Sequence, residues 1–503
     1  MFEDYFPEIA DIESGQGLPG VEGAEGIDAI FRSQSPFMEL KKALEAGYGT
    51  SPETQTGGGS FRIESLESDL KNLIFTDKST TLFNDLLQSK ITVWNTVHEY
   101  STLDDVGEAH TYEEGGLPPY NADQYSRRFE LIKYIGAVGR VTNPMMAVRS
   151  IVGPRQQEIR AKMLSIKRKA NQVSYFGDSS LVNTEFNGVI PAVMKGIDSG
   201  LVQPDNIIDL EGHRPSLEMF NEGVERIERV AGYTDNLRVY ISPNARKNYK
   251  NELLRFKRYF VGGDRKVASA DVDAELEGLK SNMLVYDGGE MPMRKDMFLN
   301  PPGPPRRNAA GNAFVAVGDK PPATPTVNSV SGASRATSTL PAGTYDYLIV
   351  AKNNLGHKSA PATSEGVTVS AGQGVAFDVE DGGSSDGQEA TAFEIYRRDA
   401  SSSDWKDYRF LFQAAANGVF HDDNQVMPDT SYMVLVEWDP ERVIRYLQLM
   451  DATLFPLANV ADRIQWLQRL YGALAVYNPK RVVIFKNAGA KSWIDEETEE
   501  TLS

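Results

Sequence analysis

The amino-acid sequence predicts an α+β protein whose mixed body is interrupted by an all-β segment. Residues 153–178 form one long amphipathic pattern, and helix and strand patterns alternate from residue 215 to about 300. A similar mixed pattern returns near Met433. Between the two, short apolar-polar runs recur about every ten residues, as in a β-sandwich. A body that stops near residue 318 and resumes near residue 433 indicates an insertion.

Composition excludes several classes of protein. The 503 residues include no cysteine, which excludes disulfides, thiolate metal sites and cysteine nucleophiles. The net charge of −18 argues against a protein that wraps nucleic acid, because phosphates require a basic surface. The charge is compatible with an assembly that encloses nucleic acid. No run of about eighteen apolar residues and no signal peptide are found, so we expect no membrane span and synthesis in a cytoplasm.

Residues 1–60 are predicted to be a flexible N-terminal arm. The first 31 residues contain eight acidic residues and neither Lys nor Arg. A short helix is predicted from Pro36, and the glycines at 57–59 interrupt any regular element after it. Such a segment is expected to order only against a partner. In the next region, apolar residues at helical spacing could line one helix face: Leu66, Leu70, Leu73 and Ile74.

Residues 61–145 are predicted to contain a projecting β-hairpin. The segment 96–128 is polar, with Gly115, Gly116 and a Pro-Pro pair near its middle, and residues 128–142 have a strand-like pattern. This order indicates two extended arms joined by a long exposed loop. The loop supplies three candidate assembly contacts: Glu113, Glu114 and Tyr120.

The helix predicted over residues 153–178 begins at Pro154, which suits a first turn, and ends at Gly177. One face is an apolar stripe of Ile159, Met163, Ile166, Ala170 and Val173. The other face is basic, carrying Arg155, Arg160, Lys162, Lys167, Arg168 and Lys169 against Glu158 alone. This face is either simply solvated, or it faces enclosed DNA or an acidic neighbour. Under the second interpretation, three residues are candidate assembly contacts: Arg160, Lys167 and Arg168.

The remaining chain is divided into regions by its pattern of predicted helices and strands. Residues 146–318 hold the long helix, a helix over 216–233, a strand over 237–242, a helix from Pro243 and a strand over 282–287. Pro- and Gly-rich sequence at 301–325 marks a boundary, and residues 319–432 form the all-β segment. Residues 433–492 return to the body. There, a strand from Met433 is followed over 439–489 by one long predicted helical stretch and a last strand. Residues 493–503 form an acidic tail.

Searches for catalytic and metal-binding patterns give no convincing site. Residues 15–20 fit G-x-G-x-x-G but lack the strand before and the helix after that a dinucleotide site needs. Residues 383–387 fit G-x-S-x-G, yet a strand is predicted after them instead of a helix. Nearby acids could hold calcium, although their spacing is not that of an EF-hand: Asp378, Glu380, Asp381 and Asp386. We therefore predict no catalytic residue, cofactor or metal, and no enzymatic activity.

The order of elements resembles the HK97-fold major capsid proteins of tailed bacteriophages. Three stretches carry the resemblance: the basic helix running into SYFGDSSLVNTEFNGVIPAVMKG, the segment TDNLRVYISPNARKNYKNELL, and the segment RLYGALAVYNPKRVVIFKNAG. The resemblance implies an N-terminal arm, an E-loop hairpin, a spine helix with a P-domain, and an A-domain. It also implies a virion protein that self-assembles through hexamers and pentamers into an icosahedral head enclosing the DNA genome. Scaffold, portal or decoration proteins would be further partners, and DNA would be enclosed without sequence-specific binding.

Residues 320–432 are similar to immunoglobulin-like or fibronectin type III-like modules, on the basis of PAGTYDYLIVAKNNLGHKSAPA, FEIYRR and FHDDN. Their late position would place the module on the outer surface of a capsid. Two alternatives remain: another structural protein of a virion or surface layer, and an adhesion or carbohydrate-binding protein built on the β module. The lack of a signal peptide disfavours the latter.

Overall fold

The computed structural model describes most of the chain after residue 76. The described ranges are 77–148, 153–232, 234, 236–260, 283–286, 289–300, 303–308, 313–318, 320–383, 389–416, 420–458 and 462–493. The predicted arm, the apolar stripe from Leu66 to Ile74, the G-x-G-x-x-G match and all but the first residue of the predicted acidic tail lie outside these ranges.

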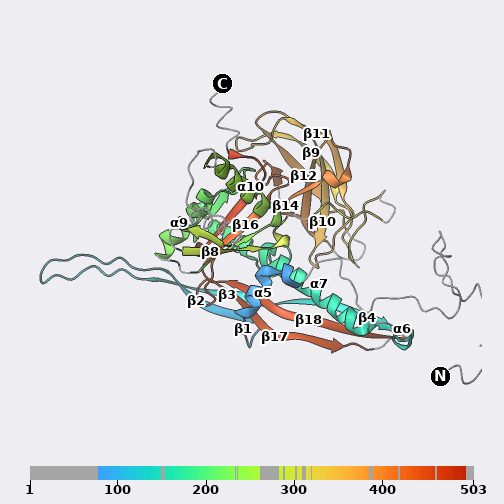
Figure 1. The fold of residues 1–503 in the computed structure, drawn as a ribbon, viewed down its shortest axis with the longest axis horizontal. Helices are drawn as coiled ribbons and strands as arrows, with labels where there is room; N and C mark the ends of the chain where they lie inside the picture. Colours follow the sequence, from blue (N-terminus) through green and yellow to red (C-terminus); the bar gives the residue numbers. More distant parts are fainter. Residues whose placement is uncertain are drawn as a thin grey trace, which may run out of the picture. The chain divides into compact units, whose positions relative to one another are not determined.

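A four-stranded sheet and the long helix α7 (Pro154–Phe176) form the first part of the body (Figure 1). The strand order is β1 (Ile91–Thr92), β17 (Ile444–Pro456), β18 (Arg463–Val476) and β4 (Lys133–Thr142). Helix α7 packs against β4 and β18, and its buried residues join the same apolar core as the sheet. The opposite face of the sheet has no such helix in the described chain.

A six-stranded sheet forms the second part of the body. Its order is β5 (Ile207–Asp209), β19 (Val482–Ala488), β16 (Ser431–Glu437), β6 (Leu237–Ile241), β8 (Gly289–Lys295) and β7 (Met283–Tyr286). Helices α9 (Leu217–Ala231) and α10 (Pro243–Phe260) share a core with it. Strand β16 lies between β6 and β19, so chain from before residue 300 and after residue 430 builds one sheet.

Residues 326–422 form two antiparallel sheets over a common core. One sheet has the order β11 (Ala362–Val369), β10 (Gly343–Asn353), β13 (Ala390–Asp399) and β14 (Arg409–Ala415). The other has the order β15 (Phe420–Asp422), β12 (Gln373–Glu380) and β9 (Thr326–Ser334). Tyr347, Phe377 and Phe393 pack between them. We call this unit the β-sandwich.

The shorter elements connect these sheets. A separate two-stranded hairpin consists of β2 (Val97–Asp105) and β3 (Gln124–Leu131). The short α-helices are α5 (Thr81–Gln88), α6 (Asn143–Ala147) and α8 (Val189–Asp198). Single-turn 3₁₀ helices are η2 (Asp77–Ser79), η3 (Pro204–Asn206), η4 (Met297–Leu299), η5 (Trp405–Asp407) and η6 (Pro479–Arg481).

Several predictions are confirmed. Helix α7 begins at Pro154 and is followed by Gly177, and the buried end of its stripe contains Ile166, Ala170 and Val173. The predicted hairpin, the helices at α9 and α10, and the strands at β6, β7 and β16 are all present. The short apolar-polar runs predicted in the all-β segment correspond to strands β10 to β15.

The prediction of one long helical stretch within residues 439–489 is wrong, because β17 and β18 occupy it as a long antiparallel pair. The error has a physical cause. Residues 465–471 of β18 alternate in burial, but residues 472–476 are buried on both faces, so the period of two is lost. Leu and Ala in this stretch also favour helices in isolation.

Two smaller differences concern strands. The strand-like segment 128–142 divides at Ile132: β3 pairs with β2, whereas β4 pairs with β18. Strand β9 was not predicted, because its Ser- and Gly-rich sequence offers little apolar alternation. It nevertheless pairs along its length with β12.

Candidate assembly surfaces

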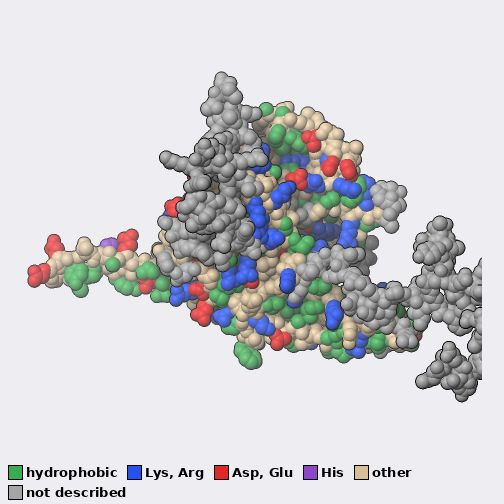
Figure 2. Space-filling view, in the orientation of Figure 1, with side chains coloured by type: hydrophobic (Ala, Val, Ile, Leu, Met, Phe, Trp, Pro, Cys, Tyr) green, Lys and Arg blue, Asp and Glu red, His purple; other side chains and the backbone are tan. Residues whose placement is uncertain are grey.

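Exposed large apolar side chains concentrate in one part of the described chain. Most of them fall between residues 94 and 148: Trp94, Val97, Leu103, Val106, Tyr112, Leu117, Tyr120, Tyr125, Phe129, Leu131, Tyr134, Val138, Met145, Met146 and Val148. Leu454 and Phe455 add two from β17. Figure 2 shows hydrophobic side chains along the projecting hairpin and acidic ones toward its end. A grouping of this kind marks an interaction surface.

One face of the hairpin is open to solvent and carries exposed apolar side chains on either side of an Arg127–Glu99 ion pair. In the strand register, Val97 lies opposite Leu131, and Leu103 lies opposite Tyr125. Phe129 lies between these pairs and is 62% exposed. Successive side chains of a strand alternate between faces, so these five residues share one side. We call them the outer hairpin face.

The opposite face of the hairpin, which we call the inner hairpin face, is polar and contacts the body. Thr102 and Ser126 lie opposite each other and both donate to the Asp104 carboxylate. At the base, the ring of Tyr100 packs edge-on against Tyr477, with centroids 4.8 Å apart. A groove of about 880 Å³ runs between this face and η6, lined in part by Arg128. The hairpin is therefore held on one face and free on the other.

The loop at the hairpin end is exposed yet internally braced. The Gly107 amide donates to Asp123 over 2.8 Å, joining the two sides of the loop. A turn closes where the Gly116 amide donates to the Glu113 carbonyl over 2.9 Å, and Gly115 has a φ of 85°. The three candidate contacts Glu113, Glu114 and Tyr120 are all exposed, the last by 90%. Their exposure agrees with the sequence, and their role in assembly stays a prediction.

A half-buried carboxylate lies where the hairpin joins the sheet. Glu130 is on the inner hairpin face, opposite His98 in the strand register. Burial raises the pKa of Glu130 to about 7, against the opposing effect of the Lys195 ammonium. Burial, with a contribution from Arg445, lowers the pKa of His98. The charge of this junction is therefore expected to change near neutral pH.

The far end of β4 forms a second surface. A cavity of about 510 Å³ lies there, lined by Arg140, Thr142, Met145, Glu158 and Arg463 among others. Because β4 runs from the hairpin to α6, this cavity lies at the opposite end of the strand from the hairpin. The cavity combines two arginines with an exposed thioether, whereas the hairpin end combines acidic and aromatic side chains.

The basic face of α7 is largely paired within the chain. Lys162 contacts Glu158 at 3.3 Å, and Lys169 contacts Glu185 at 2.6 Å. Sequence reasoning found only Glu158 as an acidic neighbour, because Glu185 lies beyond the end of the helix. The guanidinium groups of Arg155 and Arg168 lie 5.8 and 5.9 Å from the ring centres of Trp466 and Phe298.

The two groups of predicted contacts therefore belong to different surfaces. Arg160 and Arg168 are exposed and Lys167 is half-buried, all on α7, while Glu113, Glu114 and Tyr120 lie on the hairpin loop. Sequence reasoning missed the outer hairpin face and Trp94, which is 93% exposed. The alternation of apolar residues in 97–103 and 125–131 was visible, but nothing in the sequence shows whether a layer covers that face.

The weak chemical motifs gain no support. Residues 384–387 of the G-x-S-x-G match lie outside the described residues, and the chain that follows them forms strand β13, not a helix. Among the described residues, no group of three or more His, Asp or Glu side chains could hold a metal ion. Within the same ranges, no helix is long and apolar enough to cross a bilayer.

Comparison with solved structures gives capsid and capsid-like shells. The chain is similar to the capsid protein of cyanophage P-SCSP1u, with a TM-score of 0.42, 10% identity, and coverage of 88% of this chain and 97% of that chain. It is also similar to the SrpI encapsulin of Synechococcus elongatus PCC 7942, with a TM-score of 0.40, 9% identity, and coverage of 84% and 94%.

Comparison with curated proteins is more specific. The major capsid proteins of Staphylococcus phages K and S25-3 are each 23% identical to the chain over 468 residues, covering 89% of this chain and 94% of the relative. A relative from Enterococcus phage phiEF24C is 20% identical over 464 residues. No family model matches the chain.

Proposed function

We propose that this chain is the major capsid protein of a tailed bacteriophage and has a structural role without catalysis. The observation that carries the proposal is similarity to phage major capsid proteins over nearly the full length of both chains. The concentration of exposed apolar side chains on the hairpin and β4 supports it, since a shell subunit needs surfaces that other copies cover.

In this proposal the body has the HK97-like arrangement. Residues 1–60 are the N-terminal arm, the β2–β3 hairpin is the E-loop, and α7 is the spine helix. The four-stranded sheet is the P-domain, and the six-stranded sheet with α9 and α10 is the A-domain. The mixed helix-and-sheet architecture supports the assignment, as does the position of α7 along β4 and β18.

The hairpin is proposed to clasp a neighbouring subunit through its outer face and its loop. One face is already held by the body, so the outer face with Phe129 and Tyr125 is the one available to another copy. The acidic loop with Glu113 and Glu114 complements basic groups such as Arg140 and Arg463 at the opposite end of β4. Such a head-to-tail contact is heterologous, which generates closed rings when the rotation closes.

The β-sandwich is proposed to be an immunoglobulin-like or fibronectin type III-like module, inserted at residues 319–432 and facing outward. Its own core supports this proposal. So does the six-stranded sheet, which the chain leaves after β8 and rejoins at β16. Few large apolar side chains are exposed on the described part of the sandwich, as suits a surface that meets solvent.

Assembly is proposed to proceed through hexamers and pentamers to an icosahedral head in the virion, after synthesis in the host cytoplasm. The DNA genome is enclosed without sequence-specific binding, consistent with a net charge of −18. Scaffold, portal and decoration proteins are the expected further partners.

Electron microscopy of the purified recombinant protein tests the proposal directly. We expect closed shells or isolated hexamers and pentamers. A monomer at all concentrations and salt conditions, with or without co-expressed scaffold, would contradict assembly. Flat two-dimensional lattices would favour a surface-layer protein instead.

Deleting Glu113–Tyr120 tests the role of the hairpin loop. Every residue in this range is exposed, so the variant is expected to remain soluble and folded but to assemble poorly. Analytical ultracentrifugation measures assembly and circular dichroism measures folding. The control is Val230→Ser, which removes an exposed apolar side chain from α9 and should leave assembly intact.

A further inference from the structure

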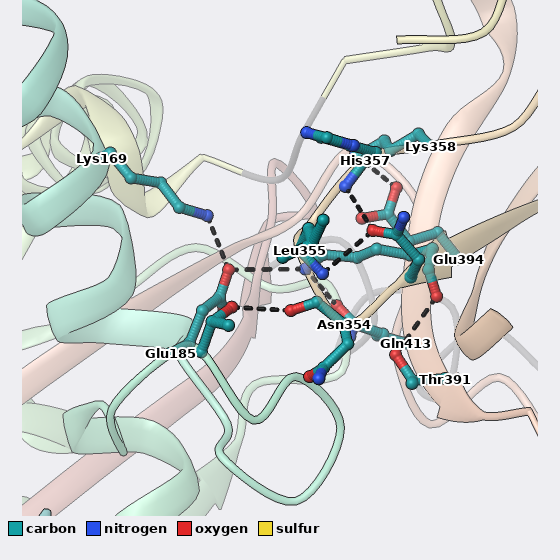
Figure 3. A network of polar contacts seen from close by, with 12 residues as sticks. Lys169, Glu185, Asn354, Leu355, His357, Lys358, Thr391, Glu394 and Gln413 are labelled. Atoms are coloured by element: carbon teal, nitrogen blue, oxygen red, sulfur yellow. Dashed lines mark hydrogen bonds and ion pairs between the residues drawn. The ribbon is translucent and has the colours of Figure 1, made fainter. Parts of the chain in front are cut away.

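A polar cluster joins the β-sandwich to the body (Figure 3). It includes Lys169 from α7, Glu185 from the α7–α8 loop, and Lys352, Asn354 and other residues of the β-sandwich. We propose that this cluster is an intramolecular clamp, which fixes the orientation of the β-sandwich on the spine-like helix α7. The two units would then move as one body.

The sandwich side of the clamp is a preformed loop. Asn353 is fully buried, and its side-chain oxygen accepts from the amides of Leu355 and His357 at 3.0 and 2.9 Å. Its side-chain nitrogen donates to the Lys320 carbonyl over 2.8 Å. The turn is completed at Gly356, whose φ is 79°. The loop therefore presents Asn354 to the body without needing to be ordered by the contact.

The body side is equally well formed. After α7, Gly177 and Gly188 are joined by a backbone hydrogen bond of 2.7 Å, which closes the α7–α8 loop. Lys195 donates to Asp178 over 2.6 Å and to Asn187 over 2.8 Å across the loop. Two ordered surfaces lose little conformational entropy when they meet.

Two hydrogen bonds connect these loops directly. The Asn183 amide donates to the Asn354 side-chain oxygen over 2.8 Å, and the Thr184 hydroxyl donates to the Asn354 carbonyl over 2.7 Å. Both backbone and side chain of Asn354 are engaged, so the contact fixes direction as well as distance.

Ion pairs surround these hydrogen bonds. Glu185 lies 2.6 Å from Lys169 of its own unit and 3.7 Å from Lys352 of the sandwich. The Lys352 side chain is only 9% exposed, so it cannot be solvated fully without separating the units. Although burial opposes the effect, Lys169 and Lys352 hold the pKa of Glu185 below its ordinary value. The charges of Glu185 and Lys352 therefore both depend on the contact between the β-sandwich and the body.

Orientation can be measured without assembly, so the test does not depend on the proposed capsid function. Because the chain has no cysteine, two spin labels can be placed uniquely at Gln172→Cys on α7 and Thr368→Cys on β11, both exposed. Double electron–electron resonance on unassembled full-length subunits then gives the distance distribution between the units. A clamp predicts one narrow distribution.

Two sets of variants disrupt the clamp independently. Glu185→Gln removes the central charge, and Thr184→Val with Asn354→Ala removes the two hydrogen bonds without burying an unpaired charge. We expect each to broaden the distribution at least twofold while circular dichroism stays native. The control Asp346→Asn breaks an equally buried ion pair with Arg398 inside the sandwich, and the distribution should stay narrow.

Two results would overturn the clamp. One is a broad distribution in the unaltered protein, which would mean a flexible tether. The other is an unchanged narrow distribution in the folded Thr184→Val/Asn354→Ala variant combined with Glu185→Gln. If Glu185→Gln alone fails to fold, the Thr184→Val/Asn354→Ala variant still distinguishes a clamp from a flexible tether.

Discussion

The hairpin and the β-sandwich are both antiparallel β-structures, but they distribute apolar side chains in opposite ways. In the sandwich, Tyr347, Phe377 and Phe393 lie between two sheets and are buried. In the hairpin, Tyr125 and Phe129 lie on a face that nothing in the described chain covers. A two-stranded ribbon has no second layer of its own, so its apolar face must remain exposed or be covered by another molecule.

The difference indicates which region is self-sufficient and which is incomplete. Apolar residues in the sandwich are expected to stabilise the subunit itself. Those on the outer hairpin face are expected to stabilise contacts between subunits, with little effect on the isolated chain. Four experiments test or sharpen this contrast.

Substituting the same residue type in each region should give opposite results. Phe393→Ala opens a cavity in the sandwich core and is expected to lower the free energy of unfolding by about 3–5 kcal/mol. Phe129→Ala should change it by less than about 0.5 kcal/mol while impairing assembly. Urea unfolding and sedimentation measure the two effects. Equal destabilisation by both would mean that the hairpin face is covered within the subunit.

The inner hairpin face should make stability depend on pH. The pKa of Glu130 is about 7 in the folded chain against an ordinary 4.5, so the folded state binds the additional proton between these values. The free energy of unfolding should therefore fall as pH rises from 4.5 to 7. Glu130→Gln removes this loss. Relative to the unaltered chain, the free energy of unfolding of the variant should be higher by up to about 3 kcal/mol at pH 8 and almost unchanged at pH 4.

Glu185 provides a control of opposite sign. Its pKa is lowered in the folded chain, so its contribution is present above the unfolded pKa and is lost as pH falls through the folded pKa. Glu185→Gln should therefore reduce stability at neutral pH, with a smaller difference in acid. Parallel pH profiles for both variants would show that Glu130 does not titrate as inferred.

The sandwich should fold without the body. Residues 320–432 contain both sheets, and we expect a soluble β domain by circular dichroism. A second fragment from residue 303 should be more stable by about 1–2 kcal/mol, because Phe314 packs against the second apolar cluster of the sandwich, formed by Leu348, Val350, Tyr396 and Tyr408. An unfolded spectrum for both fragments would refute independent folding.

The smallest effect is expected from the basic face of α7. Changing Arg160, Lys167 and Arg168 to Gln should shift the free energy of unfolding by less than about 0.5 kcal/mol for each residue, because the apolar stripe holds the helix. If these charges assist assembly, the variant should assemble less well than the unaltered chain at low salt, and this difference should disappear as salt rises. A loss of fold stability as large as that of Phe393→Ala would show that the helix depends on its charges.

Local features explain which elements could be predicted from the sequence. Helix α7 has a proline at its start, a glycine after its end and a continuous apolar stripe, all of which act within a few residues. Strand β11 alternates between exposed and covered residues over most of its length because one side of it faces the sandwich core. The exposure of Glu113, Glu114 and Tyr120 follows from a Gly- and Pro-rich segment that can carry little core.

Other features depended on contacts between distant residues. Local propensity cannot distinguish a helix from a strand where both faces are buried, and pairing between β17 and β18 decided in favour of strands. The division at Ile132 arose because β18 offers β4 a partner more than 300 residues away in the sequence.

The sequence by itself determined the helical, all-β and mixed regions and their order, because hydrophobic periodicity and chain-breaking residues are local signals. Only the tertiary structure decided which apolar faces are covered and which charges are paired. The outer hairpin face is open because no element packs on it, and Glu185 meets Lys352 across 167 positions because two folded units dock. Burial and pairing are properties of surfaces brought together, and periodicity within one segment cannot specify its partner.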